Sequence, residues 1–296
     1  MSILFIFLDG VGLAPAGPGN PLSTVPMPHL WDLLGGPLVL NGGDTSAKEV
    51  TLRALDACLG VPGLPQSATG QTALLTGVNA PALVGDHLSA YPTAPLRKVI
   101  AEHSVLKRAA EAGARVALAN AHSEQFWRMV QEGKRRLGVS TLSALAAHIP
   151  IPSLEDLEQG RAVLWDITHE IASTYLGYPL PLISAEGAGA RLSRLAMDAD
   201  LVLYESFLTD LAGHRRLAAD WVLPRLDEFL GGVLDHRPSD TTVVVSSDHG
   251  NLEDMTTKAH TSNPVPLLAV GPAAALFEEA HDLTDVAPAI LTALGI

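Results

Sequence analysis

The chain has 296 residues, of which 47% are hydrophobic and 17% charged, the balance of a folded globular protein and not of a disordered one. Its formal net charge of −13 argues against binding to nucleic acid or to anionic membrane surfaces. The single cysteine, Cys58, excludes an intrachain disulfide and a cysteine-based zinc cluster.

The first predicted strand is the apolar run at residues 3–8, which ends at Asp9. This run is too short for a signal peptide and lacks a basic flank. No stretch of the sequence approaches the length of a membrane span. We therefore expect a soluble, cytoplasmic protein.

Later apolar runs predict further buried strands, and helical patterns lie between them. The strands are expected at residues 116–119, 201–204, 242–246 and 265–270. The helices are expected at about residues 70–76, 95–112, 188–197, 218–230 and 286–294. This alternation predicts an α/β fold, with a doubly wound, mostly parallel sheet and helices on both faces.

The middle of the chain has a different texture, with several prolines, no clear strand run and the basic cluster Lys134-Arg135-Arg136. We predict a small helical insert or cap at about residues 120–186, between a first core part (1–119) and a second (187–296). The basic cluster could bind a substrate phosphate, but an exposed helix face is the favoured interpretation.

Carboxylates and imidazoles follow the predicted strands, at the edge of the sheet where functional residues gather. The set consists of Asp9, Asp210, His214, Asp248, His249 and His260. Three carboxylates and three imidazoles suit borderline divalent cations such as zinc or manganese, and they suffice for two ions with three side chains each.

Each of these residues has a plainer interpretation when it is taken alone. Asp9 fits a turn or helix-capping aspartate, and His260 fits a loop histidine bonded to the backbone. Asp210 and His214 fit a polar helix start, although one helical turn separates them and they can face one point. Asp248 with His249 is the hardest to explain by packing, and in company the whole set favours metal ligation.

Two cations about 4 Å apart favour phosphoryl transfer, because they can hold both the attacking and the leaving oxygen. Residues 66–73, with the sequence QSATGQTA, offer a nucleophilic hydroxyl at the start of a predicted helix. There the helix dipole and the first amides would stabilise an alkoxide and bind a phosphate.

Five segments of the chain occur in the order found in one family. They are residues 8–12 (LDGVG), 67–71 (SATGQ), 210–214 (DLAGH), 248–251 (DHGN) and 260–266 (HTSNPVP). With them the chain resembles the alkaline phosphatase superfamily of metalloenzymes, nearest the cofactor-independent phosphoglycerate mutase and phosphopentomutase branch. The resemblance implies two divalent metal ions, manganese or zinc, with magnesium as a third option.

The resemblance also implies a role for each candidate residue. Asp9, Ser67, Asp248 and His249 would hold one ion, and Asp210, His214 and His260 would hold the other. Ser67 would be the nucleophile, because Gly70 follows it as in the mutases, and Thr69 is the alternative. The mutases place a histidine where Gln71 stands, so the role of Gln71 is open.

The short insert favours a phosphohydrolase with a phosphoserine intermediate, acting on a small phosphorylated substrate. A mutase has to shield its dephosphorylated intermediate from water, which needs an enclosing basic lid. The alternatives are a phosphoglycerate mutase- or phosphopentomutase-like phosphomutase, a phosphodiesterase or phosphonate hydrolase, and a metal-binding module without catalysis. We make no prediction for the oligomeric state.

Overall fold

The computed structural model of the protein describes residues 1–40, 45–47, 49–175 and 180–296. Seven strands form one sheet in the order β2-β3-β7-β6-β1-β5-β4. Their bounds are Ser2–Leu8 (β1), Thr45–Ala47 (β2), Val50–Leu55 (β3), Val116–Leu118 (β4), Leu201–Ser206 (β5), Thr241–Ser246 (β6) and Val265–Val270 (β7).

The sheet is mixed. Strands β6, β1, β5 and β4 run parallel to one another, whereas β7, β3 and β2 are joined by antiparallel pairing. The predicted α/β class is confirmed, with the parallel pairing confined to one half of the sheet. The sequence patterns did not predict β2 and β3, which extend the antiparallel half.

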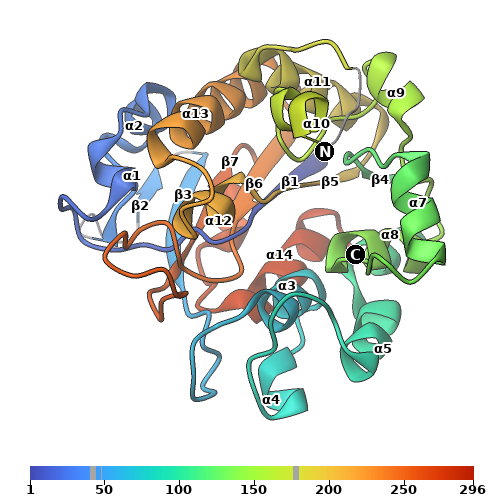
Figure 1. The fold of residues 1–296 in the computed structure, drawn as a ribbon, viewed down its shortest axis with the longest axis horizontal. Coiled ribbons are helices and arrows are strands. Elements are labelled where there is room, and N and C mark those ends of the chain that lie inside the picture. Colours follow the sequence, from blue (N-terminus) through green and yellow to red (C-terminus); the bar gives the residue numbers. More distant parts are fainter. Residues whose placement is uncertain (41–44, 48, 176–179) are drawn as a thin grey trace.

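Fourteen α-helices accompany the sheet in the described part of the chain (Figure 1). Their bounds are Pro21–Thr24 (α1), Pro28–Leu34 (α2), Ser67–Thr76 (α3), Ala80–Val84 (α4), Ala94–His103 (α5), Val105–Glu111 (α6), Glu124–Gln131 (α7), Val139–Ala146 (α8), Leu154–Glu158 (α9), Glu170–Tyr175 (α10), Ala185–Asp198 (α11), Leu208–Gly213 (α12), Ala219–His236 (α13) and Val286–Ala293 (α14). Each described helix falls short of a bilayer span in its length or in its apolar content.

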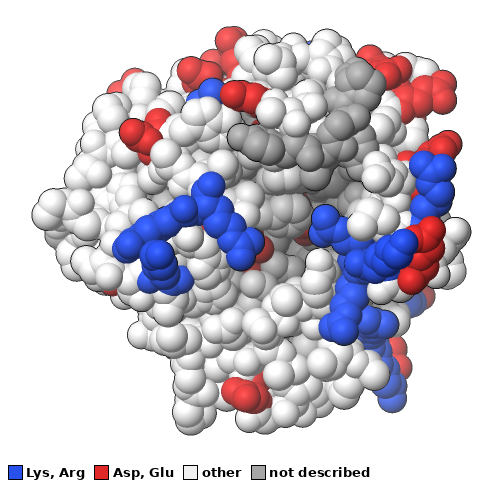
Figure 2. Space-filling model, viewed as in Figure 1, with Lys and Arg blue, Asp and Glu red and all other residues white. Residues whose placement is uncertain are grey.

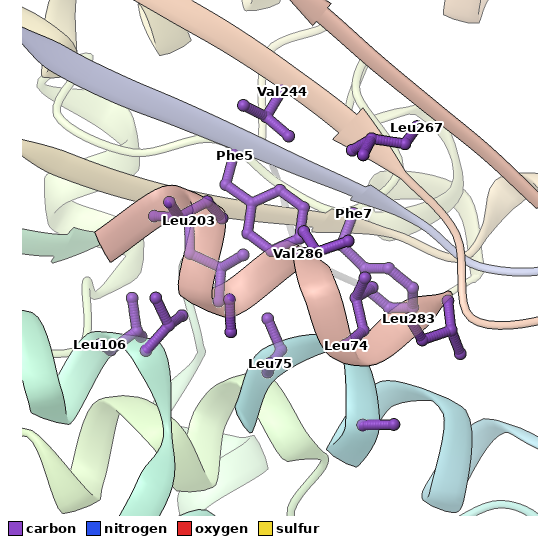
Figure 3. Close-up of a cluster of buried hydrophobic side chains, with 14 of the residues drawn as sticks. Phe5, Phe7, Leu74, Leu75, Leu106, Leu203, Val244, Leu267, Leu283 and Val286 are labelled. Carbon is purple, nitrogen blue, oxygen red and sulfur yellow. The ribbon is translucent and has the colours of Figure 1, made fainter. Parts of the chain in front are cut away.

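The two faces of the sheet carry separate hydrophobic clusters, as the two-residue period of a strand requires. In β1, Phe5 and Phe7 point to one face, and Leu4 and Ile6 point to the other. Figure 3 shows the first cluster, in which the phenylalanines face side chains of α3, α6 and α14. The second cluster lies under α11 and α13. Helices on both faces are therefore confirmed.

The segment predicted to be an insert, residues 120–186, contributes to more than one hydrophobic cluster. Val139 and Ala144 of α8 belong to the core cluster that also contains α3, α5 and α6. A small separate cluster forms between residues 121 and 180, around Leu157 and Leu164. The basic residues 134–136 are exposed and lie in the connection from α7 to α8, not on a helix. The boundaries of the insert stay a prediction.

Candidate metal centre

The predicted ligands lie at the C-terminal edge of the parallel strands. Asp9 directly follows β1, Asp210 lies in α12 after β5, and Asp248 and His249 follow β6. His260 lies in the loop that leads into β7. The space-filling view shows basic side chains gathered on two sides of a hollow in the face that Figure 1 presents (Figure 2).

One group of candidate ligands contains Asp9, Asp248 and His249, whose ligand atoms lie within 4.8 Å of one another. His249 Nε2 is 3.3 Å from Asp9 Oδ1 and 3.5 Å from Asp248 Oδ2. Ser67 Oγ lies 3.0 Å from the same nitrogen. The four residues that the resemblance assigned to one ion are therefore neighbours.

The second group surrounds Asp210. Its Oδ1 is 3.3 Å from His214 Nε2 and 3.8 Å from His260 Nε2. His249 also belongs to this group, because its ligand atom lies within 4.8 Å of those of Asp210 and His260. The rings of His249 and His260 stack with centroids 3.7 Å apart, so the two groups adjoin.

The Nε2 atoms of His214 and His260, in the second group, point toward each other. Nδ1 of His214 is 3.0 Å from the Lys258 carbonyl, and Nδ1 of His260 is 2.9 Å from the Pro65 carbonyl. A carbonyl only accepts, so Nδ1 carries a proton in both rings, and Nε2 carries a lone pair whenever the ring is neutral. The two Nε2 atoms are 3.3 Å apart. A cation between them would satisfy both.

Among the described residues, the carboxylates of the first group also have no lysine or arginine partner. Burial raises the pKa of Asp9, with the Asp248 and Asp210 carboxylates adding to the shift, and burial likewise raises the pKa of Asp248. Asp9 Oδ1 is buried without a hydrogen-bond partner among the described residues. Burial lowers the pKa of His249, so this ring does not supply the missing charge. Clustered acidic oxygens and neutral imidazoles fit a divalent cation.

Ser67 and Thr69 have different surroundings. Ser67 faces His249, whereas the Thr69 hydroxyl donates to the Gln66 carbonyl at 3.2 Å and accepts from the Leu88 N–H at 3.2 Å. The geometry therefore favours Ser67. A Cβ at Gly70 would lie 2.5 Å from the Asp248 carbonyl oxygen, so a glycine is needed for α3 to approach this strand end.

The first turn of α3 differs from the expectation in one respect. The backbone N–H groups of Ala68 and Thr69 donate to the Leu88 carbonyl, at 3.0 and 3.3 Å. They are therefore not free to bind a phosphate, contrary to what the position of Ser67 at a helix start suggested. The loop that contains Leu88 folds back over this helix end and takes both donors.

The sequence analysis left the role of Gln71 open and assigned no role to Asn251. The Gln71 amide donates to Asp9 Oδ2 at 3.2 Å and to Asp248 Oδ2 at 3.1 Å. Gln71 therefore bridges two candidate ligands of the first group. The spacing of Gln71 from Ser67 on one helix face was the available signal. The Asn251 amide donates to Asp210 Oδ1 at 3.0 Å.

Glu205, near the end of β5, is a further carboxylate beside the first group. Its charge contributes to the raised pKa of Asp9, and burial raises the pKa of Glu205 itself to about 7. The hydroxyl of Ser140, in the first turn of α8, donates to Glu205 Oε2. Helix α8 thus reaches the site, which the sequence patterns did not indicate.

Comparison with known proteins supports the resemblance. The family model described as Metalloenzyme superfamily matches residues 184–296. The 2,3-bisphosphoglycerate-independent phosphoglycerate mutase of Vibrio atlanticus (strain LGP32) is 37% identical over 97 residues, which are 29% of this chain and 19% of the mutase. The mutase of the same name from Desulforudis audaxviator (strain MP104C) is 39% identical over 107 residues, 33% of this chain and 21% of the mutase. The chain thus matches about a fifth of the length of these relatives.

Solved structures share the fold over nearly the whole chain. The PH0037 protein from Pyrococcus horikoshii has a TM-score of 0.59 at 16% identity, covering 99% of this chain and 96% of that one. The alkaline phosphatase from the Antarctic bacterium TAB5 has a TM-score of 0.55 at 15% identity, covering 99% and 97%. The family model, the relatives and the fold together bear out the resemblance to the alkaline phosphatase-like superfamily and its phosphoglycerate mutase branch.

Proposed function

We propose that this chain is a two-metal-dependent phosphohydrolase, which transfers a phosphoryl group from a small phosphorylated substrate to Ser67 and then to water. One observation carries the proposal. The Ser67 hydroxyl, half-buried at the start of α3, lies 3.0 Å from His249 Nε2, beside the buried carboxylates of Asp9 and Asp248.

Two divalent ions, manganese or zinc with magnesium as a third option, would be held by the residues that the family resemblance implies. Asp9, Ser67, Asp248 and His249 would hold one ion, and Asp210, His214 and His260 the other. When bound, such ions withdraw charge from a phosphoryl group and lower the pKa of a bound hydroxyl.

The chain's own residues supply the nucleophile and its position. Ser67 Oγ loses its proton to solvent and forms a bond to phosphorus while the bond from phosphorus to the leaving oxygen breaks, and that oxygen takes up a proton from solvent to leave as an alcohol. The dipole of α3, a helix of 10 residues, stabilises the negative charge that develops on Oγ. Water then attacks the phosphoserine from the opposite side, which releases inorganic phosphate and restores the serine hydroxyl.

Solvent access supports hydrolysis over phosphoryl return to the substrate. The side chains of His214 and Asp210 are 31% and 20% exposed, so water reaches the second group of ligands. A phosphomutase has to exclude water at the phosphoserine stage. The names of the sequence relatives favour a phosphomutase as the second candidate.

Ser67→Ala should lower kcat on phosphomonoesters by about a thousandfold or more, the order seen when a nucleophile is removed. Thr69→Val is the matched variant, because it removes the rival hydroxyl from the same helix turn, and it should retain activity. Loss of activity in Thr69→Val with full activity in Ser67→Ala would make Thr69 the nucleophile.

The reaction class is tested on a substrate panel with added manganese or zinc. Release of inorganic phosphate from monoesters supports the hydrolase. Isomerised product from 3-phosphoglycerate or ribose 5-phosphate would support the phosphomutase, and turnover of diesters or phosphonates alone would support those hydrolases. Two bound ions without turnover of any compound would identify a metal-binding module.

A further inference from the structure

Glu253 lies beside the candidate metal centre, and the proposed phosphoryl transfer gives it no role. The residue is 1% exposed, and its carboxylate accepts four hydrogen bonds. Oε2 accepts from the backbone N–H of Gly12 at 2.9 Å and from that of Asn251 at 2.8 Å. Oε1 accepts from the Thr261 hydroxyl and, at 3.0 Å, from the Asn263 amide.

These donors belong to the three loops that carry most of the candidate ligands. The first loop follows β1 and begins with Asp9. The second is the turn after β6, which contains Asp248 and His249, and the third leads into β7 and contains His260. A single carboxylate therefore ties together segments that lie as far as 241 residues apart in the sequence.

The surrounding structure leaves room for this carboxylate. A Cβ built on Gly12 would overlap the carboxyl group of Glu253, so a side chain at Gly12 would displace one of the two. By binding the backbone N–H of Asn251, Glu253 also acts on Asp210, because the side-chain amide of Asn251 donates to Asp210 Oδ1 at 3.0 Å. Glu253 thus acts on the second group of ligands as well as on the first.

We propose that Glu253 is a positioning residue, which sets the spacing of these loops so that their side chains meet around the metal ions. This inference rests on the proposed metal-dependent function. All four partners of Glu253 donate, and an ionised carboxylate offers acceptors only. The amide nitrogen of a glutamine would face at least one of these donors. Even the isosteric Glu253→Gln should therefore loosen a loop.

The test compares Glu253→Gln with Asp227→Asn. Asp227 is also 1% exposed and also accepts two backbone N–H groups, those of His29 at 3.1 Å and Leu30 at 2.9 Å. It lies in α13 and binds the start of α2, and neither of these helices carries a candidate ligand. Both variants should lose thermal stability, so stability alone does not separate the two roles.

The deciding measurement is the affinity for Mn²⁺ by isothermal titration of the metal-free full chain. Glu253→Gln should weaken Mn²⁺ binding by about 10- to 100-fold, the range known for residues that orient metal ligands. Asp227→Asn should bind Mn²⁺ like the unmodified protein. If Glu253→Gln does not fold, Thr261→Val removes a single donor and should weaken binding severalfold.

Two results would overturn the inference: unchanged Mn²⁺ affinity in the folded variants of Glu253 or Thr261, or an equal loss in Asp227→Asn. In both cases the unmodified protein still binds Mn²⁺, so the proposed function survives. An unmodified protein that binds neither Mn²⁺ nor Zn²⁺ would instead remove the proposed function, and the positioning role with it.

Discussion

Replacement of Gln71 by leucine tests whether one amide organises the two carboxylates of the first metal group. Leucine has a similar volume and keeps α3 helical, but it has no hydrogen-bond donor. The variant loses the bonds to Asp9 and Asp248, at 3.2 and 3.1 Å. Without the amide donor, the repulsion between the two carboxylates is less compensated. Their orientation toward an ion is also less restricted.

The magnitude follows from the number and length of the bonds. A hydrogen bond to a charged group contributes about 1.5–3 kcal/mol, and bonds longer than about 2.9 Å belong at the low end of that range. Two such bonds correspond to about 3 kcal/mol. If all of this is lost from metal binding, the affinity falls by about 100-fold.

The assay is isothermal titration of metal-free protein with Mn²⁺, together with the thermal midpoint with and without the ion. Thr72→Val is the matched control on the same helix, because the buried Thr72 hydroxyl donates to the Ala68 carbonyl at 2.6 Å. It should lower the thermal midpoint while the Mn²⁺ affinity stays unchanged. Wild-type affinity in Gln71→Leu, or an equal loss in Thr72→Val, would refute the reasoning.

Three further outcomes are expected. The folded-state pKa values of Asp9 and Asp248 are raised, so the metal-free protein should lose stability as the pH rises above about 4, the pKa of an aspartate in the unfolded chain. Urea unfolding should show this loss, and added Mn²⁺ should reverse it. His214→Ala should reduce the metal content measured by mass spectrometry from two ions to one, and unchanged content would exclude this ligand. Phe5→Ala should destabilise the protein by about 3–5 kcal/mol in urea unfolding, because Phe5 is fully buried against α3 and α14, and a smaller cost would mean that the site collapses around the gap.

The sequence by itself determined the central strands and most candidate ligands. The apolar runs in strands β1, β5 and β6 are buried on both faces of the sheet, and such a strand can be recognised from its own residues alone. Asp248 and His249 stood out because they lie just after such a strand. The signal is local in each case.

Only the tertiary structure decided how these parts meet. Strand β3 was not predicted, because it is only half-buried and contains Arg53, so its own residues carry no clear strand signal. It forms a strand by pairing with β7, which lies more than 200 residues later in the chain. The sequence likewise could not assign Gln71 or Glu253, since an amide or a carboxylate has no fixed partner along the chain. Their roles arise from donors and acceptors that folding brings together, and hydrogen-bond geometry exists only after the loops have closed.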